Sequence, residues 1–149
     1  MDITDPVSKI LNEKGSQVWS IPPDALVYDA IATLSERNIG ALPVTDGGKL
    51  VGVISERDYT RKVVLKGRSS KTTTVREVMS PDPVYATPTD SVEDCMRVMT
   101  EERVRHLPVV EDGKMIGIIS IGDLVNWIIL AQGAHIEQLQ RYITGEYPA

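Results

Sequence analysis

One sequence motif occurs twice in this chain, and this internal repeat constrains the fold more than any other feature. Residues 42–58 superpose on residues 107–123 without a gap, at a shift of 65 positions. Each copy has an apolar run, a turn sequence rich in Asp and Gly, a second apolar run with one internal glycine, and a closing Ser-x-x-Asp. The chain therefore contains a duplicated unit, and we expect its function to lie between the two copies.

Each copy predicts a β-hairpin followed by a helix. In the second copy Leu107–Val110 and Met115–Ile119 are short apolar runs typical of strands. Asp112-Gly113 between them is the sequence of a type I′ turn, which needs positive φ at both positions. The closing Ser-x-x-Asp then stands where the next helix is expected to begin.

Three further elements are expected before each hairpin. They are a short turn, an extended segment and a helix. The helix is indicated by apolar residues at positions i, i+3, i+4 and i+7. Proline follows the extended segment, as Pro22-Pro23 in the first copy and Pro88 in the second, and ends it because proline cannot continue a ladder. The paired elements are the short turns Val7–Leu11 and Val75–Met79, the extended segments Val18–Ile21 and Val84–Ala86, and the helices over Val27–Leu34 and Val92–Met99.

Two segments have no place in the repeat. Residues 66–74 are polar and without period, which indicates a linker exposed to solvent. Residues 131–149 have no counterpart in the first copy, but apolar residues keep helical spacing there. We therefore expect the last helix to continue through Gly133 and to stop near Gly145 and Pro148.

Composition and charge exclude several classes of function. A net charge of −5 and a pI near 5 argue against a nucleic-acid-binding protein, which would need phosphate contacts. The single cysteine, Cys95, excludes an internal disulfide and a multi-cysteine metal site. The start of the chain has no signal-peptide pattern, and no stretch approaches the roughly 18 apolar residues of a membrane span. We expect a soluble, cytoplasmic protein without a membrane partner.

The doubled Leu-Pro-Val strand and the doubled Gly-apolar-apolar-Ser-x-x-Asp resemble a tandem pair of CBS (cystathionine-beta-synthase) domains, the arrangement called a Bateman module. The resemblance covers residues 7–65 and 75–130, with 66–74 as linker and 131–149 as a C-terminal helical extension. It implies an α/β (α+β) fold of two β-α-β-β-α repeats packed sheet to sheet about a pseudo-twofold axis. It also implies a sensor that binds adenosine-containing ligands in the clefts between repeats. The tail resembles that of stand-alone paired-CBS proteins rather than a module fused to a channel or an enzyme.

Ser55-x-x-Asp58 and Ser120-x-x-Asp123 have two interpretations. In the structural one, serine caps the helix and the acid completes a capping box. In the functional one, the helix start and the serine bind phosphate, and Asp58 and Asp123 accept the ribose hydroxyls of a nucleotide. The match of both copies to the family's ribose-binding pattern favours ligand contact by at least one aspartate.

Basic residues near these motifs differ between the copies. Arg105 and His106 precede the second Leu-Pro-Val strand, where the first copy has Gly40 and Ala41. They are candidates for a phosphate clamp, because arginine offers a planar fork of donors, or else an exposed basic pair on a strand edge. Arg57 either contacts phosphate in the other cleft or points to solvent. The candidate cleft-lining residues are Ile21, Pro23, Ala41, Pro43, Ala86, Pro88 and Pro108.

Gly52 and Gly117 lie inside predicted strands. Glycine there indicates close approach by another backbone or by a base, or packing against the adjacent helix. Cys95 falls on the apolar face of a helix and is expected in the core.

The sequence thus favours a regulatory binding module over an enzyme, because its two histidines and one cysteine lie in unrelated segments. We expect AMP as ligand, followed by ATP, ADP or NAD(H), and then S-adenosylmethionine, so that the module senses energy or redox state for an unidentified regulated protein. The alternative is a ligand-free dimerisation module. A homodimer is expected in either case, from the apolar stripe Ile128, Ile129, Ile136, Leu139 and Ile143.

Overall fold

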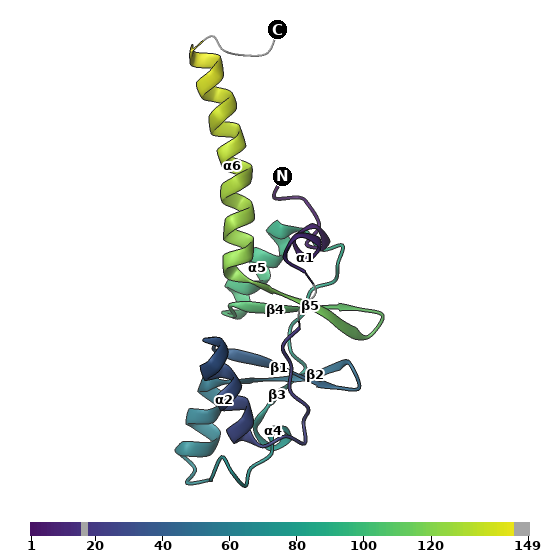
Figure 1. Cartoon of the computed structure of the whole chain (residues 1–149), viewed down its shortest axis with the longest axis vertical. Coiled ribbons are helices and arrows are strands. Elements are labelled where there is room, and N and C mark those ends of the chain that lie inside the picture. The colour runs from purple at the N-terminus through teal and green to yellow at the C-terminus, as the bar shows by residue number, and fades with distance from the viewer. Residues whose placement is uncertain (16–17, 145–149) are drawn as a thin grey trace. The chain divides into compact units, whose positions relative to one another are not determined.

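The computed structural model describes residues 1–15 and 18–144, with side chains described up to Gly133. The predicted mixed α/β class is confirmed, with one β-hairpin in each copy and helices before and after it (Figure 1). The elements are α1 (Ser8–Lys14), α2 (Val27–Arg37), β1 (Ala41–Asp46), β2 (Lys49–Ser55), α3 (Glu56–Tyr59), the π-helical turn η1 (Thr60–Val64), α4 (Val75–Val78), β3 (Ser80–Pro81), α5 (Val92–Glu102), β4 (His106–Glu111), β5 (Lys114–Ser120) and α6 (Ile121–Thr144).

The chain forms two compact units that interleave along the sequence. The α6 unit contains Met1–Gly15, Ala86–Leu107 and the described chain from Ile119 onward. The α2 unit contains the described residues of Ser16–Tyr85 together with Pro108–Ile118. Thus α1, which belongs to the first copy by sequence, lies in the unit of α5 and α6.

Both hairpins turn as the sequence predicts. Asp112 and Gly113 have φ of 52° and 78°, and Gly47 and Gly48 have φ of 59° and 86°. Two consecutive positive φ values are the signature of a type I′ turn, which matches the twist of the flanking strands. In the α2 unit the two hairpin tips are joined by the Met115 N–H, which donates to the Gly48 carbonyl at 3.0 Å.

An aliphatic core holds the α2 unit together. Helix α2 buries Val27, Ala30 and Leu34, which confirms the predicted helical stripe, against Leu42 and Val44 of β1. Ile21 forms a parallel bridge to Val44, so the predicted extended segment of the first copy is present as a single bridge.

The short strand β3 explains one of the strand glycines. It pairs with β2 through Gly52↔Pro81 and Val53↔Ser80. A Cβ on Gly52 would lie 2.7 Å from Met79 Sδ and 3.0 Å from the Ser80 carbonyl oxygen. Gly52 is therefore required by the close approach of another backbone, one of the alternatives that the sequence left open.

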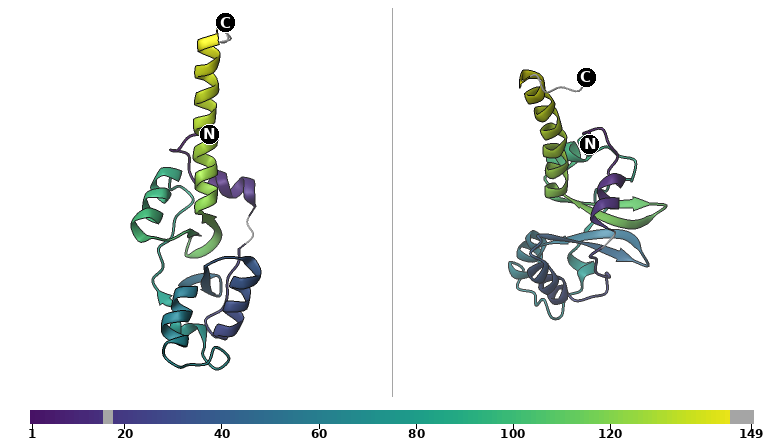
Figure 2. Two further views of the ribbon diagram at one scale, coloured as in Figure 1. Left: turned by 90° about the vertical axis from the view of Figure 1, so that its left-hand side faces the viewer. Right: turned by 45° about the horizontal axis from the view of Figure 1, so that its top comes forward.

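The α6 unit is built on α5 and α6. Helix α5 buries Val92, Cys95 and Met99, as its apolar spacing predicts. Helix α6 packs against α5 near its start and then runs on as one continuous helix to Thr144, as the views in Figures 1 and 2 show. The predicted continuation through Gly133 is confirmed, whereas the predicted stop at Gly145 and Pro148 lies outside the described residues.

The segment 66–74 is more than an exposed linker. The Thr73 side chain is buried and donates to the Ser69 carbonyl at 2.7 Å, and the Val27 N–H at the start of α2 donates to the Thr73 carbonyl at 2.9 Å. Most of this segment is exposed, as the sequence predicts, whereas Thr73 is buried because its carbonyl satisfies a donor at the start of α2.

Candidate functional site

Both copies of Ser-x-x-Asp form a capping box. The Asp58 N–H donates to Ser55 Oγ at 3.1 Å, and the Ser55 N–H donates back to Asp58 Oδ2 at 3.0 Å. The Asp123 N–H donates to Ser120 Oγ at 3.0 Å, and the Ser120 N–H donates to Asp123 Oδ2 at 2.9 Å. The capping interpretation is confirmed in both copies, and it uses Oδ2 of each carboxylate. The ribose role stays a prediction.

In the α2 unit the carboxylate of Asp58 is buried and has its own cation. Lys62 Nζ lies 3.2 Å from Asp58 Oδ1, and Ser80 Oγ donates to the same oxygen at 3.4 Å. Lys62 also donates to the Val78 carbonyl at 3.0 Å, which anchors its ammonium group within this unit. The negative charge of Asp58 is thus compensated by a residue one turn later in the chain.

In the α6 unit the cation on the equivalent carboxylate comes from a distant segment. Lys14, the last residue of α1, donates to Asp123 Oδ2 at 2.6 Å. Burial raises the pKa of Asp123, but the bonds from Lys14 and from the Ser120 N–H outweigh burial and hold this pKa below its usual range. Asp123 therefore stays ionised at neutral pH, at the start of a helix whose dipole also favours negative charge.

His106 and Arg105 stand beside this pair. Burial lowers the pKa of His106, the positive charges of Lys14 and Arg105 lower it further, and Asp123 acts in the opposite direction. The imidazole of His106 is half-buried near these cations, so the pKa of His106 lies below its usual range. Even so, Lys14 on the Asp123 carboxylate and Arg105 near His106 make this site locally basic in a chain of net charge −5.

The two copies differ in side chains at positions that have the same backbone bonding. The Ile121 N–H donates to the Arg105 carbonyl at 2.8 Å, and the Glu56 N–H donates to the Gly40 carbonyl at 3.0 Å. The same strand-to-helix junction therefore carries an exposed arginine in the α6 unit and no side chain in the α2 unit. Arg57, the other candidate cation, is exposed.

The candidate cleft-lining residues are distributed over both units. Ala41 pairs with Ser55 in the hairpin, which brings it to the start of α3. Ala41 and Pro88 are half-buried, and the other five are buried. The α2 unit contains Ile21, Pro23, Ala41, Pro43 and Pro108, and the α6 unit contains Ala86 and Pro88. Their contact with a ligand stays a prediction.

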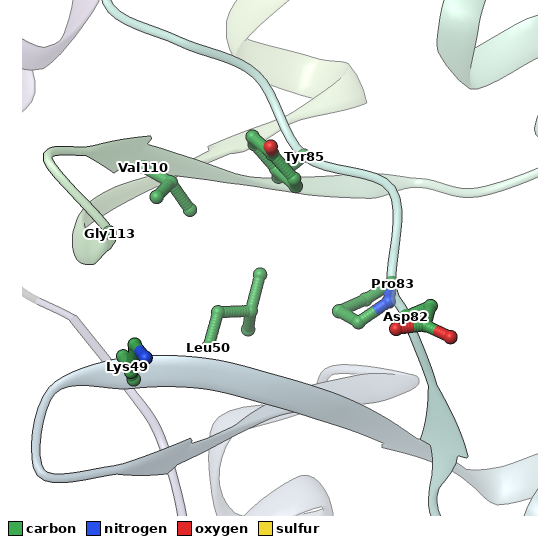
Figure 3. Close-up of a pocket in the computed structure, with 7 residues that line it drawn as sticks. All are labelled: Lys49, Leu50, Asp82, Pro83, Tyr85, Val110 and Gly113. Atoms are coloured by element: carbon green, nitrogen blue, oxygen red, sulfur yellow. The ribbon is translucent and has the colours of Figure 1, made fainter.

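A hollow of about 420 Å³ lies elsewhere in the α2 unit (Figure 3). Leu50, Pro83, Tyr85 and Val110 give it apolar walls, and it lies toward the hairpin tip at Gly113. None of the predicted ligand residues lines it. Within the residues whose side chains are described, no group of His, Cys, Asp or Glu could hold a metal ion.

Sequence reasoning missed three residues of these two sites. Lys62 carried a signal, because it stands four residues after Asp58 and such pairs meet on a helix. Ser80 and Lys14 carried none, because they are 22 and 109 residues away from the carboxylates that they contact.

Comparison with known proteins agrees with the fold and with the repeat. The family model described as "CBS domain" matches twice, at residues 7–65 and 75–130. Two tandem copies of this β-hairpin unit define the class, and the chain belongs to the CBS domain family, in the tandem arrangement of a Bateman module.

Relatives cover most of the chain. It is 40% identical to the CBS domain-containing protein CBSX3, mitochondrial, of Arabidopsis thaliana over 94% of this chain and 70% of that protein. A structure with CBS domains from Burkholderia ambifaria is 48% identical, with a TM-score of 0.76 over 85% of this chain and 96% of that one. A structure of CBSX2 in complex with AMP is 27% identical, with a TM-score of 0.68 over 85% and 97% of the two chains. Among the helices that the structure describes, none has the length and apolar character of a membrane span.

Proposed function

We propose that this chain is a regulatory module that binds an adenine nucleotide at the two helix starts carrying Ser-x-x-Asp. The observation that carries the proposal is the cluster at Asp123, where an ionised carboxylate is paired with Lys14 and lies near the titratable His106, on which Arg105 also acts. A carboxylate can accept ribose hydroxyls, and cationic donors bind phosphate. The two chemistries lie side by side, as a nucleotide requires.

AMP is the first candidate ligand, followed by ATP, ADP and NAD(H), with S-adenosylmethionine last. The AMP complex of the structural relative CBSX2 supports AMP as the first candidate for a chain of the same family. A monophosphate suits Arg105 and His106, which supply one planar fork of donors and one imidazole. The hydroxyl of Ser120, which accepts the Asp123 N–H, can still donate its own proton to the phosphate or the ribose.

The α2 unit offers a second, less charged site. There Asp58 and Ser55 would bind the ribose, but Gly40 and Ala41 replace the basic pair. The exposed Arg57 is the candidate for phosphate. We expect the α6-unit site to bind nucleotides more tightly, because charge-assisted hydrogen bonds are about twice as strong as neutral ones.

Regulation would follow from differential affinity. A ligand that binds one arrangement of the repeats better than another shifts the population toward that arrangement, and an unidentified partner protein responds. The proposed role is binding without catalysis, because His106, His135 and Cys95 form no nucleophile–base pair in the sequence. The alternative is a ligand-free dimerisation module.

A homodimer is part of the proposal. Val125, Ile129 and Leu130 are large apolar residues of α6 with 41%, 58% and 45% of their surface exposed. Such a group of exposed apolar side chains favours burial against another chain. Of the predicted stripe, Ile129 is exposed and Ile128 is half-buried, whereas Ile136, Leu139 and Ile143 lie outside the side chains that the structure describes.

The test is a thermal melt of the purified protein with nucleotides. A ligand that binds only the folded state adds roughly 2.7 kcal/mol to the free energy of unfolding at a hundredfold excess over its Kd. AMP should raise Tm by several degrees and GMP by less. No shift with AMP, ADP, ATP, NAD or S-adenosylmethionine up to millimolar concentration would refute the sensor and favour the dimerisation module.

A further inference from the structure

We propose that the hollow at the hairpin tips of the α2 unit is a further binding site, which takes a small aromatic carboxylate. Its volume of about 420 Å³ falls within the range of small-molecule sites, roughly 300–1,000 Å³. All of its lining residues belong to the α2 unit, so the site is formed within one compact unit. The proposal does not depend on nucleotide binding at the Ser-x-x-Asp motifs.

The hollow is separate from the helix starts that carry those motifs. Leu50 is the second residue of β2 and Ser55 is the last, so about 16 Å of strand lies between them at roughly 3.3 Å per residue. In β4, Val110 likewise lies four residues beyond His106, toward the hairpin tip. A small ligand between Leu50 and Val110 therefore needs no residue of either motif.

The walls of the hollow suit a flat apolar group. Leu50 and Val110 come from the two hairpins and point toward each other across the hollow, and the rings of Pro83 and Tyr85 lie beside them (Figure 3). Tyr85 is 55% exposed and Leu50 and Val110 are half-buried, so a ligand that covers them gains hydrophobic free energy. The ring of Tyr85 also offers a face on which another aromatic ring can stack.

The polar groups of the hollow favour an anion. Lys49 lies at the end of the hollow near Gly113 (Figure 3). The carboxylate of Asp82 lies at the other end and points away from the hollow, beyond the ring of Pro83. Within the residues whose side chains are described, the Lys49 ammonium group and the Tyr85 hydroxyl have no ion-pair or hydrogen-bond partner. Both groups can therefore donate to a carboxylate whose ring lies between the apolar walls.

Methyl NMR of the full chain follows this site directly. The probe is 3-phenylpropionate, and its matched neutral analogue is 3-phenylpropan-1-ol, which has the same ring and chain without the charge. Both should shift the methyl signals of Leu50 and Val110 in a saturable way, and neither should shift the methyl signals of Ile129, which is exposed on α6. The carboxylate should bind about fivefold more tightly than the alcohol, the upper end for an ion pair at an exposed lysine.

Three variants separate the charge from the walls. Lys49→Met should remove the preference for the carboxylate and leave binding of the alcohol unchanged. Lys114→Met is the matched control, because Lys114 has the same place in the second hairpin, is also exposed, and does not line the hollow. Tyr85→Ala should weaken both compounds about fivefold, because both lose the ring on which they stack.

Three results would overturn the proposal. No saturable shift of the Leu50 and Val110 signals with 3-phenylpropionate up to tens of millimolar would refute the site. Equal binding of the carboxylate and the alcohol, or a preference that survives in Lys49→Met, would refute the selection of an anion. Displacement of 3-phenylpropionate by AMP would show that the hollow belongs to a nucleotide site, which would overturn this proposal and support the proposed function.

Discussion

Gly52→Ala is expected to destabilise the α2 unit through one identifiable clash. The new Cβ would lie 2.7 Å from Met79 Sδ, 3.1 Å from Met79 Cγ and 3.0 Å from the Ser80 carbonyl oxygen. The Met79 side chain can rotate, but the Ser80 carbonyl belongs to β3, which is held by its pairing with β2. Overpacking of this kind costs about 2 kcal/mol, within a usual range of roughly 1–3. For a chain of this length we expect Tm to fall by roughly 4–8 °C.

Thermal and urea denaturation, followed by circular dichroism, measure this effect. Gly40→Ala is the matched control, because a Cβ there meets nothing within 4 Å and its φ is ordinary; its Tm should stay close to that of the wild type. The same displacement of β3 would move Ser80 away from Asp58 Oδ1, which it contacts at 3.4 Å. If Gly52→Ala melts with the control, the argument that β3 fixes this position is refuted.

Three further changes follow from the structure. Because the pKa of His106 is lowered in the folded protein, the unfolded chain takes up a proton on this imidazole more readily than the folded one. The free energy of unfolding should therefore be at its full value above about pH 6.5 and should fall as the pH drops toward the folded pKa. His106→Asn should flatten this pH dependence of stability, and an unchanged slope would contradict the lowered pKa. The Cys95 thiol is 2% exposed and burial raises its pKa to about 11, so Ellman's reagent at pH 8 should react with it only after denaturation; rapid labelling of the native protein would contradict its core position. Ile129→Ser should weaken the homodimer in analytical ultracentrifugation while Asn126→Ser, also exposed on α6, should not; a monomeric wild type at tens of micromolar would refute the proposed dimer.

Local patterns in the sequence predicted most of the fold. The type I′ turn at Asp112-Gly113 and the apolar spacing of α2 and α5 depend on neighbouring residues, so the sequence alone reveals them. The strand β3 was missed, because its two residues have no alternation and pair only through long-range contact with β2.

The candidate site was predictable only where the repeat marked it. Ser55, Asp58, Ser120 and Asp123 were found because both copies carry them at the same spacing. Lys14 was not found, because its contact with Asp123 depends on the docking of α1 beside the start of α6, and no local pattern encodes that contact.

The central claim is that adenine nucleotide binds at the two aspartates of the Ser-x-x-Asp motifs. Calorimetric titration of AMP into the wild type, Asp58→Asn, Asp123→Asn and the double variant tests it directly. Asparagine keeps an oxygen for the capping bond from Ser55 or Ser120, so the fold should survive while the carboxylate is lost. The account predicts saturable binding to the wild type, loss of the tighter site in Asp123→Asn and no binding to the double variant. Equal AMP binding by the wild type and a folded double variant would contradict it.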